Sequence, residues 1–319
     1  MPPREFPIGR DEDGSRLETF LRRRLGLPRG EAQKALRKGW VRVDGRRSKP
    51  DTRLAPGQVV RITNNGLPLP GVDGDVVSDA ASQAPARAVP PADVEAARAS
   101  IRHADPAFLV ANKPAGVAIH AGSGHAWGAI DALGRALGEA PPVPIGRIDR
   151  DTSGLLALAR TRGAARRMFD GLKGGTLART YTALVLGRLT PDQGTIDLPL
   201  EKRGSEGRER MEPDGAGLPA RSLWRVLARR REATLVALEL DTSRTHQLHA
   251  HLAARGHPIL GDPRYGDDAA RALARRLELE RLFLHAGRLV LLHPDDDRPL
   301  TFDEPLPPEL EQVLAKLRE

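Results

Sequence analysis

Residues 146–158 read GRIDRDTSGLLAL, a charged loop that leads directly into an apolar run. The first half holds two carboxylates, Asp149 and Asp151, among arginines, and the second half has the continuous apolar character of a buried strand. Catalytic side chains are commonly carried by loops that a rigid element holds in place. A charged loop by itself is more often solvated surface, so the choice between the two interpretations depends on the rest of the chain.

The composition of the 319-residue chain favours more than one domain and excludes several kinds of site. Cysteine is absent, which excludes disulfides, thiolate metal sites and cysteine nucleophiles and fits a reducing cytosol. No apolar run approaches the roughly 18 residues of a membrane span, and residues 1–10 lack the apolar core of a secretory signal. We therefore expect a cytoplasmic protein with no membrane partner.

Positive charge is concentrated at the beginning of the chain. Residues 1–64 hold 16 Lys and Arg against 8 Asp and Glu, so the whole net charge of +8 lies in this segment. A small basic unit is typical of nucleic-acid binding, because each neutralised phosphate releases condensed counterions. A basic surface without a partner and an anionic membrane patch are the alternatives, and RNA is the favoured partner.

Two basic helices and a small hairpin are predicted in this segment: residues 15–26, 28–38, 41–43 and 59–62. Ser15, with Glu18 three residues later, fits a capping box at the first helix. The order of elements, with KGWVRVDG at residues 38–45, resembles the S4 RNA-binding module over residues 14–63. The resemblance implies phosphate contacts by basic side chains of the helices and hairpin: Arg22, Arg23, Arg24, Arg37, Lys38 and Arg42.

Residues 65–93 are dominated by Pro, Gly, Ala, Asp and Ser, which predicts a flexible linker. Residues 101–319 form the second predicted domain. Strands are expected on both sides of a turn within residues 108–120 and at 155–160, 180–186, 221–228, 233–240 and 283–292, and helices at 129–138, 162–172 and 245–255. Since the elements do not alternate in βαβ order, the fold class is α+β, with a mixed, mainly antiparallel sheet flanked by helices.

Cofactor and metal chemistry find little support in the sequence. Neither a phosphate-binding loop nor a Gly-x-Gly-x-x-Gly turn follows a predicted strand, and a Gly-x-Ser-x-Gly elbow is also missing. His246 and His249 share a helix face, but His251 fits that face poorly and only Asp262 is available as a carboxylate ligand nearby. We expect these histidines to serve helix packing and hydrogen bonding, and we expect neither metal nor cofactor.

Three separated segments together resemble the signatures of one enzyme family. GRIDRDTSG (146–154), RTYTALV (179–185) and TSRTHQLH (242–249) are similar to the three motifs of the RluA-type pseudouridine synthases. Supporting blocks occur in the right order: NKPAG at 112–116, GHPI at 256–259 and LFLHA at 282–286. With the S4-like segment, the resemblance covers nearly the whole chain outside the linker, and the C-type enzymes of large-subunit ribosomal RNA are the most similar branch.

The resemblance implies an enzyme that isomerises uridines of 23S ribosomal RNA to pseudouridine, without a cofactor and as a monomer. Asp149 would be the catalytic carboxylate, and Arg244 would form an ion pair that keeps it charged. Tyr181 would be the platform for a flipped base and take part in removing its proton. Arg147 and Lys113 would contact the RNA backbone.

Three positions depart from the family motifs. Gly146 stands where the family has histidine, Arg179 where it has lysine, and His249 where it usually has arginine. We expect these changes to affect how the protein binds RNA beside the site more than the reaction itself, since Asp149, Tyr181 and Arg244 are retained. Transfer RNA or other ribosomal uridines as substrates, and a non-catalytic ribosome-assembly factor, remain the alternatives, as does attack of Asp149 on either the base or the sugar carbon.

Overall fold

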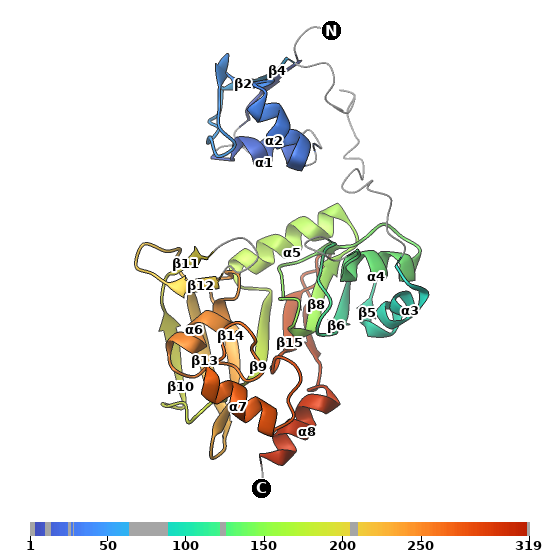
Figure 1. Cartoon of the computed structure of the whole chain (residues 1–319). Helices are drawn as coiled ribbons and strands as arrows, with labels where there is room; N and C mark the ends of the chain where they lie inside the picture. Colours follow the sequence, from blue (N-terminus) through green and yellow to red (C-terminus); the bar gives the residue numbers. More distant parts are fainter. Residues whose placement is uncertain are drawn as a thin grey trace. The chain divides into compact units, whose positions relative to one another are not determined.

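The computed structural model describes residues 4–9, 14–24, 27, 29–63, 89–121, 126–204 and 210–317, without the side chains of residues 4, 23, 24 and 29–31. Backbone contacts divide the chain into two compact units, Met1–Ala86 and Arg87–Glu319 (Figure 1). The side chains of Arg23 and Arg24, and residues 64–88 of the predicted linker region, lie outside what the structure describes.

The first unit joins two helices and a four-stranded antiparallel sheet in one apolar core. The helices are α1 (Leu17–Arg24) and α2 (Arg29–Arg37), and the sheet order is β1-β4-β2-β3. The strands are β1 (Arg4–Pro7), β2 (Val41–Val43), β3 (Arg46–Arg47) and β4 (Val59–Ile62). The predicted S4-like combination of a helical hairpin and strands is confirmed.

The beginning of α1 is held differently from the prediction. Helix α1 starts at Leu17, and the backbone N–H groups of Leu17 and Glu18 donate to the carbonyl oxygens of Thr52 (2.8 Å) and Pro50 (3.0 Å). These free N–H groups at the start of a helix need acceptors, and a neighbouring loop supplies them here. The predicted capping box of Ser15 and Glu18 was therefore wrong.

The second unit begins earlier than its predicted start at residue 101. Helix α3 covers Pro91–Ser100, with a proline in its first turn, where a missing N–H costs nothing. The predicted end of the linker at residue 93 lies inside this helix. No residue of α3 is buried. The sequence of this helix accordingly lacks the clear apolar period of a helix that packs against a core.

The second unit is built on one large sheet with the order β10-β13-β14-β9-β15-β8-β6-β5, to which β16 adds at β15 and β7 at β8. Only the pair of β15 and β8 is parallel among the described strands. The strands are β5 (Ile101–Ala104), β6 (Phe108–Lys113), β7 (Val143–Pro144), β8 (Ser153–Ala159), β9 (Ala178–Leu186), β10 (Gln193–Asp197), β13 (Arg221–Arg229), β14 (Ala233–Leu240), β15 (Leu284–Leu292) and β16 (Pro299–Asp303). The predicted α+β class with a mixed, mainly antiparallel sheet is confirmed.

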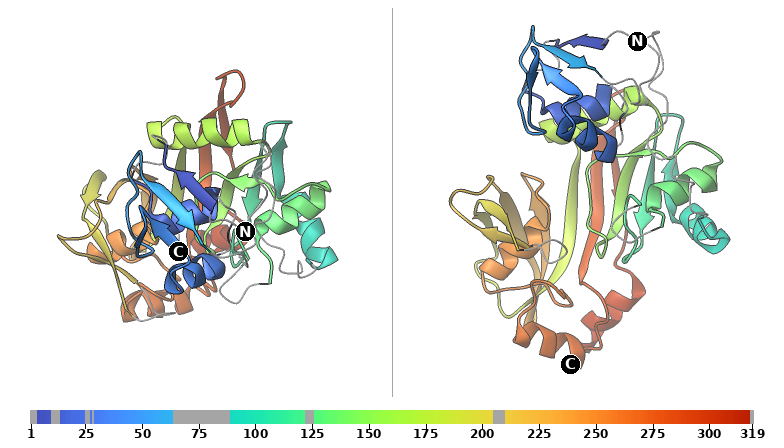
Figure 2. Two further views of the ribbon diagram at one scale, coloured as in Figure 1. Left: turned by 90° about the horizontal axis from the view of Figure 1, so that it is seen from above. Right: turned by 45° about the horizontal axis from the view of Figure 1, so that its top comes forward.

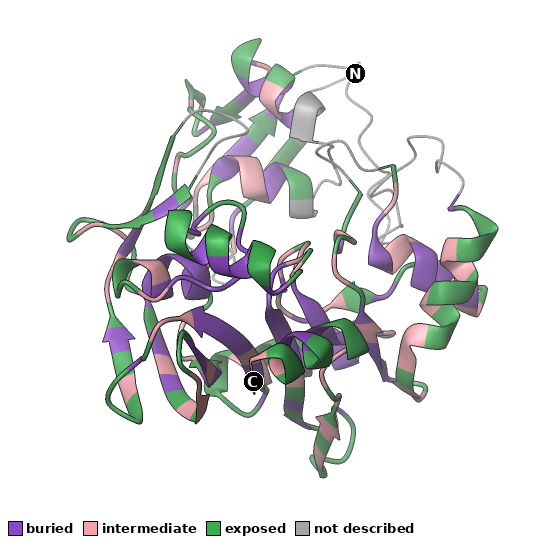
Figure 3. Ribbon diagram, turned by 60° about the horizontal axis from the view of Figure 1, so that its bottom comes forward, coloured by how far each residue is buried: buried purple, intermediate pink, exposed green. Residues whose placement is uncertain are grey.

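Helices cover both faces of this sheet. Strand β8 is buried along its whole length, with Leu155 and Ala157 in the core beneath α5 (Arg162–Gly174) and Leu156 and Leu158 in the core shared with α4 (Ala129–Leu137) and α6 (Gln247–Ala254). Helices α5 and α6 accordingly lie on opposite sides of the sheet (Figure 2). The central strands are buried, as Figure 3 shows, while the helices expose their outer faces.

The remaining elements lie around the rim: the hairpin β11 (Leu200–Arg203) and β12 (Arg210–Pro213), α7 (Asp268–Arg276) and α8 (Pro308–Lys316). Within the described residues, no helix has the length and apolar character that crossing a membrane requires. The strand predicted after the turn at residues 114–116 does not form. Carbonyl groups there serve other partners, since Val117 accepts from the Lys113 amine (2.8 Å) and Ala118 accepts from the N–H of Ala129 (2.8 Å).

The parallel pair of β8 and β15 explains the glycine that ends the charged loop. Gly154 has φ +114° and lies opposite Ala286, and a Cβ added there would come within 2.4 Å of the Ala286 carbonyl oxygen. A residue with a side chain cannot take this place without moving one of the two strands. The loop containing Asp149 is thus fixed at the point where two distant segments of the chain meet.

Candidate active site

Asp149 lies in the loop between β7 and β8, and buried apolar residues of this loop anchor it to the core. Ile145 and Ile148 are buried, and a turn closes as the N–H of Thr152 donates to the carbonyl of Asp149 (3.2 Å). The Asp149 side chain keeps 29% of its surface exposed. A carboxylate is therefore held at the surface of the core, open to an incoming molecule.

Two of the departures from the family motifs compensate for each other. The guanidinium of Arg179, on β9, donates to the carbonyl of Ile145 and lies over Gly146, where a Cβ would approach its Nη1 atom to 3.0 Å. Gly146 also has φ +73°, in the region that favours glycine. The lack of a side chain at position 146 leaves space for the buried Arg179, whose hydrogen bond to Ile145 holds the beginning of the loop.

The charged partner of Asp149 is His249, on α6. His249 Nε2 is 3.4 Å from Asp149 Oδ2, and His249 Nδ1 is 2.6 Å from Asp262 Oδ2. The first contact is long and lacks hydrogen-bond alignment, so it acts as an ion pair, while the second is a short hydrogen bond. Asp262 is itself fixed, because its other oxygen accepts from the N–H groups of Arg264 (2.9 Å) and Tyr265 (3.0 Å).

Electrostatics keep this Asp149–His249–Asp262 array ionised. Burial opposes protonation of His249, but the two carboxylates outweigh it and raise the pKa of the imidazole to about 9. Burial would raise the pKa of Asp149, but His249, His246 and Arg147 outweigh it and hold that pKa below its usual range. The pKa of Asp262 is likewise lowered, because contact with His249 and two backbone N–H groups overcomes burial. At neutral pH, one imidazolium separates two carboxylates.

Arg244 does not make the predicted ion pair. In the described part of the chain it has no such contact with Asp149, and its Nε donates to the carbonyl of Pro219 (3.1 Å). The reason is the turn before α6, which Gln247 fixes by accepting from the N–H of Arg244 (3.1 Å) and the hydroxyl of Thr242 (2.9 Å). Arg244 still lines the same small cavity as Asp149.

Asp149 lies at the border of two cavities. The smaller, of about 110 Å³, is lined by Asp149, Thr152, Tyr181, Arg244 and His249 among others, and reaches the core. The Tyr181 ring is buried, and burial followed by the charge of Asp149 raises the pKa of its phenol, which is protonated at neutral pH. Thr152 Oγ1 is buried without a hydrogen-bond partner. A planar molecule entering this cavity would meet a carboxylate, a phenol and a spare hydroxyl.

The larger cavity, of about 620 Å³, is more open and has a basic rim. Its lining includes Arg147, Arg150, Arg264 and His246 as well as Asp149. Arg147 is exposed and borders both cavities, as expected for a group that contacts a backbone phosphate. His246 turns the chain into α6 with φ +49°, and its Nδ1 lies 3.3 Å from the hydroxyl of Tyr265.

Lys113 is not available to RNA, contrary to the prediction. Its side chain is 2% exposed, and its Nζ donates to the carbonyl oxygens of Pro114, Val117 and Arg150, each at 2.8 Å. Burial lowers the pKa of this amine to about 7, while three acceptors match the three N–H groups of the ammonium form. Lys113 ties the turn after β6 to the Asp149 loop.

Replacing Lys113 by methionine is expected to lower the free energy of unfolding by about 2–4 kcal/mol, because three buried carbonyl oxygens lose their donor. The Asp149 loop also loses its link to the turn after β6, so activity is expected to fall. Chemical denaturation of Lys113→Met beside Lys173→Met, an exposed lysine on α5, is the measurement. Equal stability of the two variants would contradict the role of Lys113 as a clamp.

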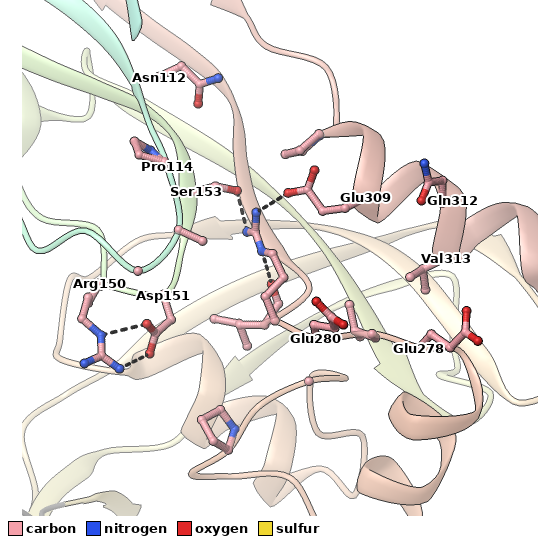
Figure 4. Close-up of a pocket in the computed structure, with 18 of the residues that line it drawn as sticks. Asn112, Pro114, Arg150, Asp151, Ser153, Glu278, Glu280, Glu309, Gln312 and Val313 are labelled. Carbon is pink, nitrogen blue, oxygen red and sulfur yellow. Dashed lines mark hydrogen bonds and ion pairs between the residues drawn. The ribbon is translucent and has the colours of Figure 1, made fainter. Parts of the chain in front are cut away.

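Asp151 and Ser153 take part in two separate sets of contacts beside the loop (Figure 4). Asp151 pairs with Arg150 through contacts of 2.8 and 3.0 Å. Ser153 Oγ accepts from Arg281 Nη2 (2.7 Å) and lies 2.8 Å from His285 Nδ1. Arg281 also bonds Glu309 of α8 (3.0 Å), so the C-terminal helix supports the start of β8.

The three neighbouring histidines have different partners. His249 lies between carboxylates and His246 beside Tyr265, whereas His251 bonds Ser222 Oγ (2.9 Å) and the carbonyl of Leu198 (3.0 Å). Burial lowers the pKa of His246 and His251. The structure therefore makes His249 a functional candidate that the sequence showed only as a departure from a motif, and Asp262 its second partner.

In the first unit, the four predicted phosphate contacts whose side chains are described are all exposed: Arg22, Arg37, Lys38 and Arg42. Lys38 and Arg42 lie at the junction of α2 and β2, where the Lys38 amine is 5.5 Å from the centre of the Trp40 ring. Exposed cations beside an aromatic ring suit RNA, which offers both phosphates and unstacked bases.

Comparisons with known proteins agree with this geometry. The family described as RNA pseudouridylate synthase matches residues 107–254, and the S4 domain matches residues 15–60. The ribosomal large subunit pseudouridine synthase C of Vibrio cholerae is 36% identical over 98% of this chain and 96% of its own length. The protein of the same name from Escherichia coli is also 36% identical, over 98% and 95%.

Two solved human proteins named for the same family are also similar to this chain. Human RNA pseudouridylate synthase domain containing 4 aligns with a TM-score of 0.59 and 25% identity, over 71% of this chain and 97% of its own. Human RNA pseudouridylate synthase domain containing 1 aligns with a TM-score of 0.55 and 27% identity, over 69% and 94%. The chain belongs to the RNA pseudouridylate synthase family and carries an S4 domain before its synthase domain.

Proposed function

We propose that this pseudouridine synthase acts on uridines of large-subunit ribosomal RNA, with Asp149 as its catalytic carboxylate. The observation that carries the proposal is the place of Asp149, ionised beside His249 and at the border between a small buried cavity and a larger one with a basic rim. The relatives matched over nearly their whole length are named for the large ribosomal subunit.

The two cavities suit a flipped nucleotide. A uridine paired in RNA is out of reach of a carboxylate until its base leaves the stack. In our proposal the base enters the small cavity beside Tyr181, while Arg147 and the rim of the larger cavity hold the flanking phosphates. Arg244 lines the small cavity and contacts the base or sugar there, free of any ion pair to Asp149.

The reaction requires no external reagent. The C1′–N1 bond of the nucleoside breaks, the uracil turns, C5 bonds to C1′, C5 gives up its proton and N1 gains one, so atoms and electrons balance. Asp149 serves this sequence as a nucleophile or as an electrostatic partner of the sugar, and both need the charged form that His249 maintains. We accordingly propose that no cofactor takes part.

The S4 domain would add affinity through Arg22, Arg37, Lys38 and Arg42. Such phosphate contacts are independent of sequence and weaken steeply as salt rises. In this proposal the S4 domain raises the local concentration of RNA, and the synthase domain selects the uridine.

Mapping of pseudouridine in purified RNA tests the substrate. The full chain is incubated with 23S ribosomal RNA or transfer RNA, each transcribed without modifications, and every new pseudouridine is located. We expect modification at a few positions of 23S RNA and at least tenfold slower reaction with transfer RNA. Preferential modification of transfer RNA would support the alternative substrate, and tight binding without any pseudouridine would support a non-catalytic assembly factor; either result overturns the proposal.

A further inference from the structure

His249 stands out because both of its ring nitrogens face a carboxylate and almost none of it reaches solvent. Its side chain is 8% exposed, with Asp149 at 3.4 Å on one side and Asp262 at 2.6 Å on the other. Only the doubly protonated ring carries an N–H group toward each carboxylate, as hydrogen-bond donor to Asp262 and as ion-pair partner of Asp149, so the geometry selects the imidazolium. This cation differs from an arginine, the usual residue at this position of the motif, because it can lose its proton.

We propose that His249 is the positioning residue of Asp149 and holds that carboxylate through a proton it can lose, so that turnover falls in alkaline solution. The inference rests on the proposed catalytic role of Asp149. When the ring becomes neutral, Asp262 still bonds Nδ1–H, and Nε2 then presents a lone pair to Asp149 instead of a proton. The attraction that fixes Asp149 is replaced by repulsion between two acceptors.

Several charged and titratable groups lie around His249. Its own helix and the turn before it contribute His246, with ring centres 5.5 Å apart, and the loop after α6 contributes Asp262, Arg264 and Tyr265. The Asp149 loop adds Arg147. The two carboxylates are the groups in direct contact, and they raise the pKa of His249 to about 9, so the imidazolium is present below this pH and disappears above it.

The stability of the fold should change with pH in the same direction as the activity. The pKa of His249 is higher in the folded chain than the ordinary value of 6.5. The contribution of the array to stability is therefore fully present below pH 6.5 and is lost as the pH rises through about 9. Activity and stability should both decline on the alkaline side.

Single-turnover rates of pseudouridine formation between pH 8 and 10 test the proposal. The ratio of the His249→Arg rate to the wild-type rate is expected to rise about tenfold over this range, because arginine keeps its charge while most of the histidine loses it. Titration of the RNA itself affects both proteins equally and cancels in the ratio. A ratio that stays constant would show that another group controls the alkaline decline and would overturn the proposal.

A second variant guards against poor accommodation of arginine in a buried site. Asp262→Asn keeps an oxygen for the N–H groups of Arg264 and Tyr265 but removes the charge beside His249. It is expected to move the alkaline decline of the rate about one pH unit lower. An unchanged decline in Asp262→Asn would count against the array.

Nuclear magnetic resonance of the histidine side chains separates this inference from the proposed function, because it needs no RNA. In the free protein, His249 should titrate near pH 9, and about one pH unit or more lower in Asp149→Asn and in Asp262→Asn, while His251, bonded to Ser222 and Leu198, serves as an internal reference. A wild-type His249 that titrates near 6.5 refutes the positioning role. A titration near 9 in a protein without synthase activity on any RNA would instead refute the catalytic role of Asp149.

Discussion

Asp149→Asn is expected to reduce the single-turnover rate of pseudouridine formation by a factor of roughly 10³ or more, the scale seen when a reacting group is removed. The amide has nearly the shape of the carboxylate, so the loop between Ile148 and Thr152 should keep its conformation. What disappears is the negative charge that His249 stabilises and that the proposed reaction uses. Affinity for RNA is expected to stay within a factor of about two, since phosphate contacts come from cationic groups.

Asp151→Asn is the matched control, two residues further along the same loop. Asp151 forms a partly exposed ion pair with its neighbour Arg150, and such surface pairs contribute about 0–1 kcal/mol. Its rate should remain within a few-fold of wild type. If Asp149→Asn retained the wild-type rate, or if the two variants were equally impaired, the assignment of the catalytic carboxylate would be wrong.

The sequence predicts most of the fold because the strands carry strong patterns. Residues 155–158 and 180–186 are apolar or β-branched throughout, and both lie in central strands. The pairing of β8 with β15 could not be predicted, because the two strands are separated by more than a hundred residues and no local signal specifies which neighbours a buried strand receives. The capping of α1 by a distant loop was missed for the same reason.

The sequence placed Asp149 and Tyr181 together in one candidate site but assigned a contact of Asp149 to the wrong residue. The motif identified Asp149 and Tyr181, which do line one cavity, but assigned the ion pair to Arg244. The resemblance alone implied that ion pair, and Arg244 lies in the turn before α6, which starts at Gln247 after His246 turns through a positive φ. His249, on α6 itself, is the residue that pairs with Asp149.

Lys113 shows a different limit of sequence reasoning. A lysine is almost never fully buried, so its exposure is the natural expectation and an RNA contact the natural role. Burial here depends on three carbonyl groups from two segments converging on one amine, which only the folded chain brings together. The same argument applies to Arg179, whose burial requires the empty space at Gly146.

Replacing Tyr181 is expected to separate two functions of one side chain. Tyr181→Phe keeps the aromatic surface between its strand neighbours Leu238 and Ala286 but removes the hydroxyl from the cavity that contains Asp149. If the hydroxyl takes part in proton transfer from the base, the single-turnover rate should fall about 10²-fold, the lower range for loss of a group in acid–base catalysis. Affinity for RNA should hardly change.

Tyr181→Leu removes the ring as well and should cost more on every measure. Base stacking on an aromatic ring contributes about 1–3 kcal/mol, so RNA with a flipped uridine should bind roughly tenfold or more weakly. The buried cavity left by the smaller side chain should also lower the free energy of unfolding by about 1–3 kcal/mol. Rates, RNA affinity and denaturation curves for the two variants give the comparison. Burial raises the pKa of the phenol and keeps it protonated, so the hydroxyl can first act as a hydrogen-bond donor. If Tyr181→Phe kept the wild-type rate, the hydroxyl would have no part in proton transfer and Tyr181 would serve only for stacking.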